Sequence, residues 1–530
     1  MEMIARKTFL LMVSQFINAL AGWIALCVIA KLWNGFAPAA LGVIQFSISF
    51  LAIFNLVADL GFGQAHIKKI SEGKELARCI GTYAFIKLLL TLLMACAVLI
   101  FIFAIEHLGY AYPSGTSKSL LLIFLFYFLF QNLISIPFRT FDGLRETAKR
   151  SVASVVEVLV RVPLMILVAL LAMESVTGAT LNLPAFLLRL QRLFASNPIS
   201  SLSWCYVFGM AGTLLVSLLF FRKHSIGRPS LALLKEYSRF ALVVALIPII
   251  TILLTSVDKV MIGFFWSEVE VGYYFSAYKI ITLLLIIPLA IETLLFPTIS
   301  SFHARRDLGA IENVTRATER YASMIIMPLT VFLIVLPGPV LAILFSEDFL
   351  PAVGALSLLG CWALIYSIDI PYTSLLRGIN RPDLLVKVGA VACGINVLAN
   401  LLLIPKSGLL ASVGISGPEG AGFATLLAEV FALIFLRLTV RKTVRMKVCQ
   451  IHTLKHAVAG ALMGACLVGL GRLLPLTKWW ELFIYAAFAL FSYFAFNHLL
   501  KEFDTKDVNF FINLLHPGEL IKYMSTELKK

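Results

Sequence analysis

Residues 80–105 read IGTYAFIKLLLTLLMACAVLIFIFAI, a run in which Lys87 is the one charged side chain. About 20 apolar residues suffice for a helix to cross a bilayer, and unpaired backbone is not tolerated in hydrocarbon, so this run predicts a transmembrane helix. The whole chain has the same character, because 60% of its 530 residues are hydrophobic and 14% are charged. This composition excludes a water-soluble protein, and the alternating pattern of an outer-membrane barrel is missing.

Further apolar runs follow one another along the chain, separated by polar, basic or Gly/Pro-bearing breaks. Together they predict an all-α polytopic membrane protein with about fourteen transmembrane helices. The predicted spans cover roughly residues 8–30, 38–64, 80–105, 119–137, 151–172, 201–221, 240–264, 271–296, 321–345, 352–376, 384–404, 419–440, 457–474 and 480–500. The first run is too long for a signal-peptide core, so we expect it to be retained as the first span.

The distribution of lysine and arginine predicts the orientation. With a cytoplasmic N-terminus, the inner segments hold 33 of the 44 basic residues and the outer segments hold seven. Basic residues in short loops stay on the cytoplasmic side. We therefore expect a multi-pass protein of the cytoplasmic (inner) membrane with both termini in the cytoplasm. This asymmetry also accounts for the net charge of +15, and we expect no nucleic-acid partner.

Two stretches of the chain indicate an internal repeat. AKLWNGFAPAALGVIQFSISF begins at residue 30 and DKVMIGFFWSEVEVGYYFSAYKI begins at residue 258. Laid side by side, they set Lys31 against Lys259 and Gly42 against Gly272. Parallel halves of this kind predict two pseudo-symmetric six-helix lobes plus two C-terminal helices. The predicted divisions are an N-terminal lobe at 1–225, a C-terminal lobe at 226–445, and a final part at 446–530 with the last two helices and a cytoplasmic tail.

Nothing in the sequence indicates a catalytic site. No GxxxxGK[ST] phosphate loop is present, and no extramembrane segment is long enough for a catalytic domain. Cys449, His452 and His456 have a metal-like spacing, but a solvated basic loop is the preferred interpretation. We expect a protein that is not an enzyme, with no catalytic residue, no metal and no cofactor.

The longest outer connection, residues 173–200, contains LPAFLLRLQRLF around Arg189 and Arg192. Its apolar residues have helical spacing, which predicts an interfacial helix lying on the outer leaflet. A substrate gate is the alternative interpretation.

Ionisable residues within the spans are the candidate functional residues, because a charge at the bilayer centre is rarely retained without a partner or a wet cavity. A substrate pathway is predicted along Lys87, Arg161, Lys259, Lys279, Glu157, Asp258 and Lys31. Candidates for ion coupling are Asp59, Glu292, Asp369 and Glu429. Glu157 and Arg161 lie one helical turn apart and can pair, either as a self-neutralised strut or as part of the function. Fixed positive charge inside the protein favours an anionic substrate, since Arg and Lys suit phosphate.

Three segments resemble the polysaccharide (O-antigen type) flippases of the multidrug/oligosaccharidyl-lipid/polysaccharide (MOP) superfamily. GVIQFSISFLAIFNLVADLGFGQAHIKKIS is similar to the family's second span with its Asp-Leu-Gly-Phe exit and basic inner loop. TSVDKVMIGFFWSEVEVGYYFSAYKI is similar to its seventh and eighth spans, and LRGINRPD, at 376–383, to the inner loop after its tenth span.

The resemblance implies a V-shaped, two-lobed protein that alternates between inward and outward openings. Its implied function is to flip a polyprenyl-pyrophosphate-linked oligosaccharide across the cytoplasmic membrane for cell-surface polysaccharide biosynthesis, such as that of lipopolysaccharide. The implied partners are this anionic lipid-linked glycan and membrane lipid, with other polysaccharide-assembly proteins as further candidates.

Three alternatives stay open. The related peptidoglycan-precursor flippases have fourteen spans where polysaccharide flippases often have twelve, so a lipid II flippase is the first alternative. The second is a cation-coupled multidrug exporter, which should have acidic residues dominating the cavity of the first lobe. The third is a non-transporting scaffold for glycan assembly.

Overall fold

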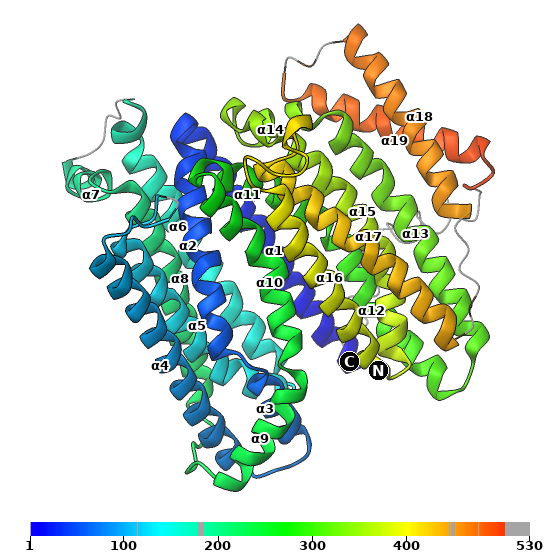
Figure 1. Cartoon of the computed structure of the whole chain (residues 1–530). Helices are drawn as coiled ribbons and strands as arrows, with labels where there is room; N and C mark the ends of the chain where they lie inside the picture. The colour runs from blue at the N-terminus through cyan, green and yellow to red at the C-terminus, as the bar shows by residue number, and fades with distance from the viewer. Residues whose placement is uncertain are drawn as a thin grey trace.

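The computed structural model describes residues 2–113, 115–178, 185–444, 446, 451–474, 476 and 478–503. Within these residues the chain is helical and has no strand (Figure 1). The helices are α1 Glu2–Trp33, α2 Ala37–Asn55, α3 Phe62–Ser71, α4 Leu76–Leu108, α5 Lys118–Leu144, α6 Thr147–Thr177, α7 Ala185–Ala195, α8 Pro198–Phe221, α9 Leu231–Val244, α10 Leu246–Phe265, α11 Glu268–Leu284, α12 Ile286–Ala304, α13 Leu308–Val335, α14 Pro337–Leu344, α15 Val353–Gly378, α16 Pro382–Leu403, α17 Gly417–Val444, α18 Ile451–Leu473 and α19 Glu481–Leu499.

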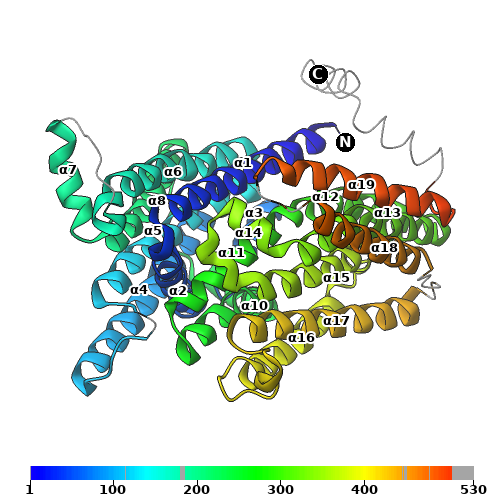
Figure 2. The same ribbon diagram turned by 90° about the horizontal axis from the view of Figure 1, so that it is seen from above.

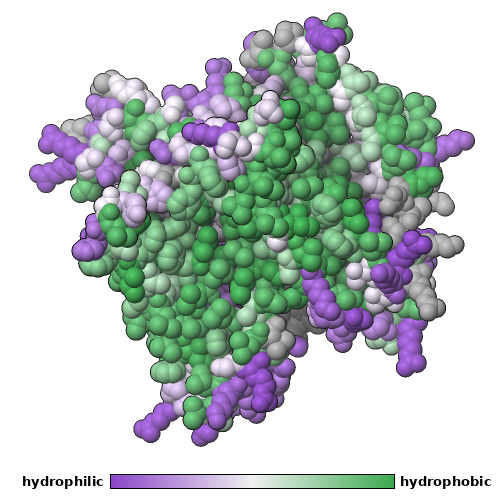
Figure 3. Space-filling view, in the orientation of Figure 1, coloured by the Kyte–Doolittle hydropathy of each residue, from purple (hydrophilic) through white to green (hydrophobic). Residues whose placement is uncertain are grey.

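Thirteen helical segments of the described chain are long and apolar enough to cross a membrane. The first of them, Val13–Ala58, has 46 residues, and at 1.5 Å per residue it spans about 70 Å, more than twice the thickness of the hydrocarbon layer. It contains both α1 and α2, so fourteen crossings result. Apolar side chains cover the middle of the molecule, and hydrophilic ones gather toward its two ends (Figure 3). The predicted all-α, multi-pass membrane fold is confirmed.

Local chemistry explains where several of these helices begin and end. The side chain of Ser117 accepts a hydrogen bond from the backbone N–H of Leu120 at the start of α5, and Asn197 does the same for Ser200 at the start of α8. Such caps satisfy backbone donors that have no partner inside the helix. At the C-terminal end of α6, Gly178 adopts a left-handed φ of 75°. Glycine reaches this conformation without steric cost.

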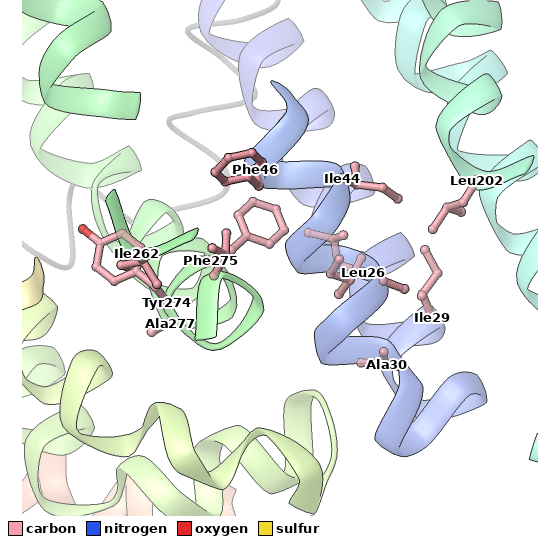
Figure 4. Packing of buried hydrophobic residues seen from close by; sticks show 14 of the residues in the cluster. Leu26, Ile29, Ala30, Ile44, Phe46, Leu202, Ile262, Tyr274, Phe275 and Ala277 are labelled. Carbon is pink, nitrogen blue, oxygen red and sulfur yellow. The ribbon is translucent and has the colours of Figure 1, made fainter. Parts of the chain in front are cut away.

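Two groups of helices are joined at one end of the molecule, the end that carries the first turns of α2 and α11. We call this the joined end. The helices α1, α5, α6 and α8 pack on one another, as do α13, α15, α16 and α17, while α2 packs against α10 and α11 (Figures 1 and 2). One hydrophobic cluster draws on both groups, and Figure 4 shows among its members Leu26, Ile29, Ala30, Ile44, Phe46, Leu202, Ile262, Tyr274, Phe275 and Ala277.

At the opposite end, which we call the split end, the two groups have separate hydrophobic clusters. One cluster gathers Ala65, Tyr83 and Tyr237 from α3, α4 and α9. The other gathers Ile299 and Tyr372 with residues of α13, α16 and α17. Figure 1 shows the ends of α3 and α9 lying apart from those of α12 and α16. The helices of the two groups are therefore held together mainly at the joined end.

The repeat glycines make the contact at the joined end. A Cβ added to Gly42 of α2 would clash with the carbonyl oxygen of Glu268, and one added to Gly272 of α11 would clash with the carbonyl oxygen of Pro38. Each glycine thus lets the backbone of one repeat touch the backbone of the other. The alignment of Gly42 with Gly272, made from sequence, corresponds to a reciprocal contact between the two helices.

Helix α9 belongs by its contacts to the N-terminal group. The ring nitrogen Nδ1 of His66 lies 2.9 Å from the Tyr237 hydroxyl, and Nε2 lies 2.9 Å from the hydroxyl of Thr140. The backbone N–H of Gly227 also donates to the carbonyl of Ala77 at 2.8 Å. The predicted division at 225/226 stays a prediction, as does that at 445/446, but α9 itself packs on α3 and α4.

The last two spans, α18 and α19, dock on α13 (Figure 2). Glu502, which follows α19 and is 4% exposed, accepts hydrogen bonds from Arg320 at 3.0 Å and Lys455 at 3.1 Å. The imidazole of His452 contacts the same carboxylate at 2.5 Å. Because a buried carboxylate is costly unless it is paired, this cluster anchors the C-terminal helices to the remainder of the protein.

Candidate functional site

A cavity of about 460 Å³ lies among α1, α5, α6 and α8. We call it the N-lobe cavity. Its polar lining includes three arginines and two carboxylates, supplied by Arg139, Arg150, Arg161, Asp142 and Glu157. Aromatic and amide side chains complete much of the wall, among them Tyr127, Gln131, Phe138, Tyr206 and Asn18. The cavity can therefore receive an anionic group together with polar or planar neighbours.

Arg161 and Glu157 form the expected pair. The guanidinium Nε of Arg161 donates to a Glu157 carboxylate oxygen at 2.5 Å, and the Arg161 and Glu157 side chains are 12% and 16% exposed. The guanidinium also lies 4.9 Å from the centre of the Tyr206 ring. Gly209 of α8 makes room for this arrangement, because a Cβ added there would lie 3.0 Å from the Cβ of Arg161.

Arg139, Asp142 and Arg150 were missed as site residues by sequence reasoning, which placed them in a basic inner loop. In the structure α5 continues to Leu144 and α6 starts at Thr147, so these side chains stand on helix ends. Arg150 donates to Asp142 at 2.5 Å, and Arg139 lies 3.8 Å from the same carboxylate. The available signal was their spacing, since Arg139 and Asp142 lie three residues apart, as neighbours on one helix face do.

Lys279 does not line the N-lobe cavity but lies within electrostatic range of its ion pair. It stands on α11, and its charge interacts with those of Arg161 and Glu157. Its ammonium lies 5.4 Å from the centre of the Phe275 ring. Two residues of the predicted substrate pathway, Arg161 and Glu157, thus line one cavity, and the charge of a third, Lys279, interacts with theirs.

Asp258 forms a second polar centre among α10, α11, α16 and α17. Its carboxylate accepts hydrogen bonds from Tyr274 at 2.6 Å, from Asn400 at 2.6 Å and from Thr425 at 2.9 Å. Asn400 also donates to the side-chain oxygen of Asn396 at 3.1 Å. The Asp258 carboxylate is thus held by one amide N–H donor and two hydroxyl donors, which lowers the cost of burying it. Within the described chain, no group of three or more His, Cys, Asp or Glu side chains is arranged to hold a metal ion.

The remaining predicted pathway cations are placed differently from one another. Lys87 is 4% exposed and donates to the carbonyl of Ala58 at 2.6 Å, while Lys259 is 5% exposed and donates to the carbonyl of Thr255. Lys31 is exposed near the end of α1. Lys259 is buried within α10, whereas Lys31, with which the repeat alignment pairs it, is exposed. Their equivalence in the two repeats stays a prediction.

The candidates for ion coupling also separate into different settings. Asp369 of α15 is buried and interacts with Glu429 of α17, whose carboxylate accepts a hydrogen bond from Trp362 at 3.2 Å. Glu292 of α12 instead forms an ion pair with Arg377. Asp59 is half-buried beyond the end of α2. The structure brings Asp369 and Glu429 together but does not join them to Glu292 and Asp59 in one site.

Two further expectations concern the connections. The stretch around Arg189 and Arg192 forms α7, which packs on α6 and α8, and both arginines are exposed. A helix is thereby confirmed there, whereas its position on a leaflet stays a prediction. Cys449 lies outside the described residues. His452 and His456 both face Glu502, in keeping with a role in helix docking.

The arrangement defines a class of membrane-protein fold. In the described part of the chain, two groups of helices joined at one end match the fold of solved transporters of the MOP superfamily. The lipid II flippase MurJ, in an inward closed conformation, superposes with a TM-score of 0.70 over 93% of this chain and 98% of that chain, at 15% identity. An inward-facing multidrug resistance MATE family transporter gives a TM-score of 0.57 over 81% and 94%, at 16% identity. A MOP superfamily transporter from Pyrococcus furiosus gives 0.53 over 83% and 95%, at 17% identity.

Sequence comparisons show similarity to proteins of polysaccharide and glycan biosynthesis. Residues 185–354 match a family described as polysaccharide biosynthesis protein. Two proteins of Haloferax volcanii are similar in sequence: "Probable flippase AglR" is 27% identical over 33% of this chain and 36% of its own length, and "Probable low-salt glycan biosynthesis flippase Agl15" is 22% identical over 32% and 34%. The match spans about a third of the length of these relatives. The resemblance to polysaccharide flippases is confirmed over about a third of the chain, and the fold is similar to that of the solved MOP superfamily transporters.

Proposed function

We propose that this protein is a flippase that moves a polyprenyl-pyrophosphate-linked oligosaccharide across the cytoplasmic membrane, for the biosynthesis of a cell-surface polysaccharide. The observation that supports this most is the N-lobe cavity, whose lining has more arginines than carboxylates. Arginine presents a planar set of donors that suits phosphate oxygens. The two flippase relatives and the polysaccharide family match support the same proposal.

In this mechanism the anionic diphosphate enters from the split end and meets the arginines of the N-lobe cavity. Arg161 and Arg150 each already face a carboxylate, at 2.5 Å in both cases. A diphosphate therefore competes with Glu157 and Asp142 for the guanidinium groups, which keeps the substrate from being held too tightly to leave. Rocking of two lobes, proposed at 1–225 and 226–445, then closes the split end and opens the joined end.

The proposed orientation places the split end in the cytoplasm. The basic segments at that end, such as α3 with Lys68 and Lys69, support this because basic loops stay inside. Both termini then lie in the cytoplasm, and the substrate is loaded where it is assembled.

A lipid II flippase is the second candidate function. It is supported by the superposition with MurJ over 93% of the chain. A multidrug exporter is less well supported. Acidic residues should dominate the first lobe's cavity in such an exporter, whereas arginines outnumber carboxylates in the N-lobe cavity. A non-transporting scaffold for glycan assembly would have no use for an arginine-lined cavity.

Reconstitution of the purified protein in vesicles tests the proposal. Fluorescent polyprenyl-pyrophosphate oligosaccharide and fluorescent lipid II are supplied separately, and an impermeant reagent measures how much of each reaches the opposite leaflet. We expect movement of the oligosaccharide lipid above that of protein-free vesicles. Exclusive movement of lipid II would favour the second candidate, and cation-driven efflux of a dye without movement of either lipid would reject both.

A further inference from the structure

A second basic cavity lies at the split end, between α3 and α9. Its volume is about 410 Å³, and its lining is Lys68, Lys69, Lys235, Glu236, Arg239 and Phe240. It is built by α3 and α9, whereas the N-lobe cavity is built by α1, α5, α6 and α8. Figure 3 shows hydrophilic side chains gathered at the lower tip of the molecule, over α3 and α9. We call it the α3–α9 pocket.

The carboxylates near this pocket are already compensated. The ammonium of Lys69 lies 2.8 Å from Glu72 and 2.6 Å from Glu236, and Lys74 lies 3.6 Å from Glu236. The hydrogen bond with Glu236 raises the pKa of Lys69, and the same bond lowers the pKa of Glu236. Both groups are therefore charged at neutral pH. Glu236 is shared between Lys69 and Lys74, and Glu72 between Lys69 and Lys68, so neither carboxylate neutralises Lys235 or Arg239.

The other cations of the pocket have few partners. Lys235 and Arg239 are exposed, stand one turn apart on the same face of α9, and have no hydrogen-bond or ion-pair partner in the described part of the chain. The ammonium of Lys68 lies 4.3 Å from the centre of the Phe240 ring and 3.8 Å from Glu72. Positive charge in the pocket thus exceeds the negative charge available to balance it.

The walls of the pocket are held in place before any ligand binds. Behind it, the buried His66 of α3 contacts Tyr237 of α9 at 2.9 Å. The backbone N–H of Ser230, just before α9, donates to the hydroxyl of Thr82 at 3.0 Å. These contacts hold α9 against α3 and α4. The backbone that carries the basic side chains is therefore already ordered, and ligand binding does not have to bear the entropic cost of ordering it.

We propose that the α3–α9 pocket binds a phosphate-type anion at the membrane surface. Basic pockets between helices at the cytoplasmic face are suited to phospholipid headgroups, and the aliphatic lysine stems and Phe240 can contact the adjoining chains. The phosphate has two sources, the headgroup of an anionic phospholipid or a phosphate that is free or carried by another lipid. This inference does not rest on the proposed transport function.

The site has a structural consequence for α9 and α10. Only Ala245 separates the two helices, and α10 packs on α2 and α16. An anion held jointly by Lys68 of α3 and Arg239 of α9 would strengthen the attachment of α9 to the N-terminal group of helices. Movement of the C-terminal group would then be taken up at Ala245.

Binding to the full-length protein in detergent tests the proposal. The probes are dioctanoyl phosphatidylglycerol, inorganic pyrophosphate and, as a neutral reference, dioctanoyl phosphatidylcholine. Lys235→Gln/Arg239→Gln is compared with Arg441→Gln/Lys442→Gln, which removes the same charge from an exposed stretch of α17. For pyrophosphate all proteins also carry Glu157→Gln/Arg161→Gln, to weaken binding in the N-lobe cavity to the same extent in each protein compared.

We expect the pocket variant to bind an anionic probe about 30-fold more weakly than the matching protein with the pocket intact, because two cations near the surface are lost, and the α17 variant to bind it unchanged. Weakening confined to phosphatidylglycerol identifies a phospholipid headgroup as the ligand, and weakening confined to pyrophosphate identifies a free or differently carried phosphate. Equal affinities of the pocket variant and the α17 variant for both anionic probes would overturn the proposal. Size-exclusion profiles and melting temperatures check that both variants are folded.

Discussion

At the scale of the residue, the pair of Glu157 and Arg161 has two possible roles, one structural and one in substrate binding. A pair one helical turn apart can serve only to cancel its own charge, or it can hold an arginine ready for a substrate. Its position in the wall of a 460 Å³ cavity beside Arg139 and Arg150 favours the second role. A pure strut would be equally useful facing another helix.

Separate and joint substitutions of this pair distinguish the two roles. Arg161→Gln leaves Glu157 without its partner, and breaking one side of a buried pair costs about 3–5 kcal/mol of stability. Glu157→Gln/Arg161→Gln leaves no unpaired charge, so we expect it to recover most of that stability. We expect movement of the labelled oligosaccharide lipid to stay at least about tenfold below normal in the double variant, since the phosphate contact is still missing.

Melting temperature and lipid movement are measured on the same preparations. Lys442→Gln, an exposed cation on α17, serves as the control for removing one positive charge. Normal movement in the double variant would assign the pair to the strut role.

His66 provides a pH-dependent contribution to stability. Burial lowers its pKa from 6.5 to about 3, because the charged imidazolium is not solvated between α3 and α9. The folded protein thus binds fewer protons at His66 than the unfolded chain does between these values. The contribution is fully present above pH 6.5 and is lost as the pH falls toward 3.

We therefore expect the melting temperature of the unmodified protein to fall more steeply below pH 6.5 than that of His66→Asn. Melting curves recorded down to about pH 4 measure the difference. Carboxylates that titrate in both proteins affect both melting temperatures equally, so they do not contribute to the difference. Parallel plots of melting temperature against pH would show that His66 makes no pH-dependent contribution to stability.

At the scale of the element, the crossing of α2 and α11 decides how the joined end is closed. The two helices approach through Gly42 and Gly272, each of which lies against a carbonyl of the other helix. Because backbone atoms cannot move aside as a flexible side chain can, even a methyl group must push the helices apart. The repeat glycines therefore act as a steric lock between the two halves of the chain.

Gly42→Ala is expected to loosen the joined end and to cost about 1–3 kcal/mol through overpacking. Gly394→Ala is the matched control, since an added Cβ at that position of α16 has no heavy atom within 4 Å. A cysteine at position 40, where Ala40 is fully buried, reports the change in a background without native cysteines. We expect an impermeant thiol reagent to label it faster with Gly42→Ala than with Gly394→Ala, and equal rates would contradict the lock.

At the scale of the whole molecule, the distribution of the core suggests how the lobes move. One hydrophobic cluster reaches across both groups of helices, while α3, α4 and α9 share a cluster separate from that of α12 and α15. Opening the joined end must expose apolar surface of the shared cluster. In the proposed cycle, closure of the split end and bound substrate offset that cost.

Exposed positions at the two ends test the orientation on which this cycle depends. Leu409 is 74% exposed in the connection between α16 and α17. Trp266, just before α11 at the joined end, donates to the carbonyl of Ile404 in this connection. Arg228 is exposed before α9 at the split end. In intact cells, a cysteine at 409 should react with an impermeant reagent, and one at 228 should react only after the membrane is broken. The reverse pattern would place the joined end in the cytoplasm.

The sequence by itself determined the membrane class, the number of crossings, the aligned glycines and the pairing of Glu157 with Arg161. These properties depend on local features: the length of an apolar run, the residues in a loop, or a spacing of one helical turn. The resemblance to polysaccharide flippases could also be detected from sequence, because the Asp-Leu-Gly-Phe exit and the segment around Asp258 are each continuous in the chain.

Only the tertiary structure decided which charged residues share a site. Arg139 and Arg150 join Arg161 because α5 and α6 extend further than their apolar runs and turn those faces toward one cavity. Asp258 acquires Asn400 and Thr425 from helices more than a hundred residues away. Local composition does not encode the rotation of a helix about its axis or the distance between two lobes, because both result from the packing of many side chains at once.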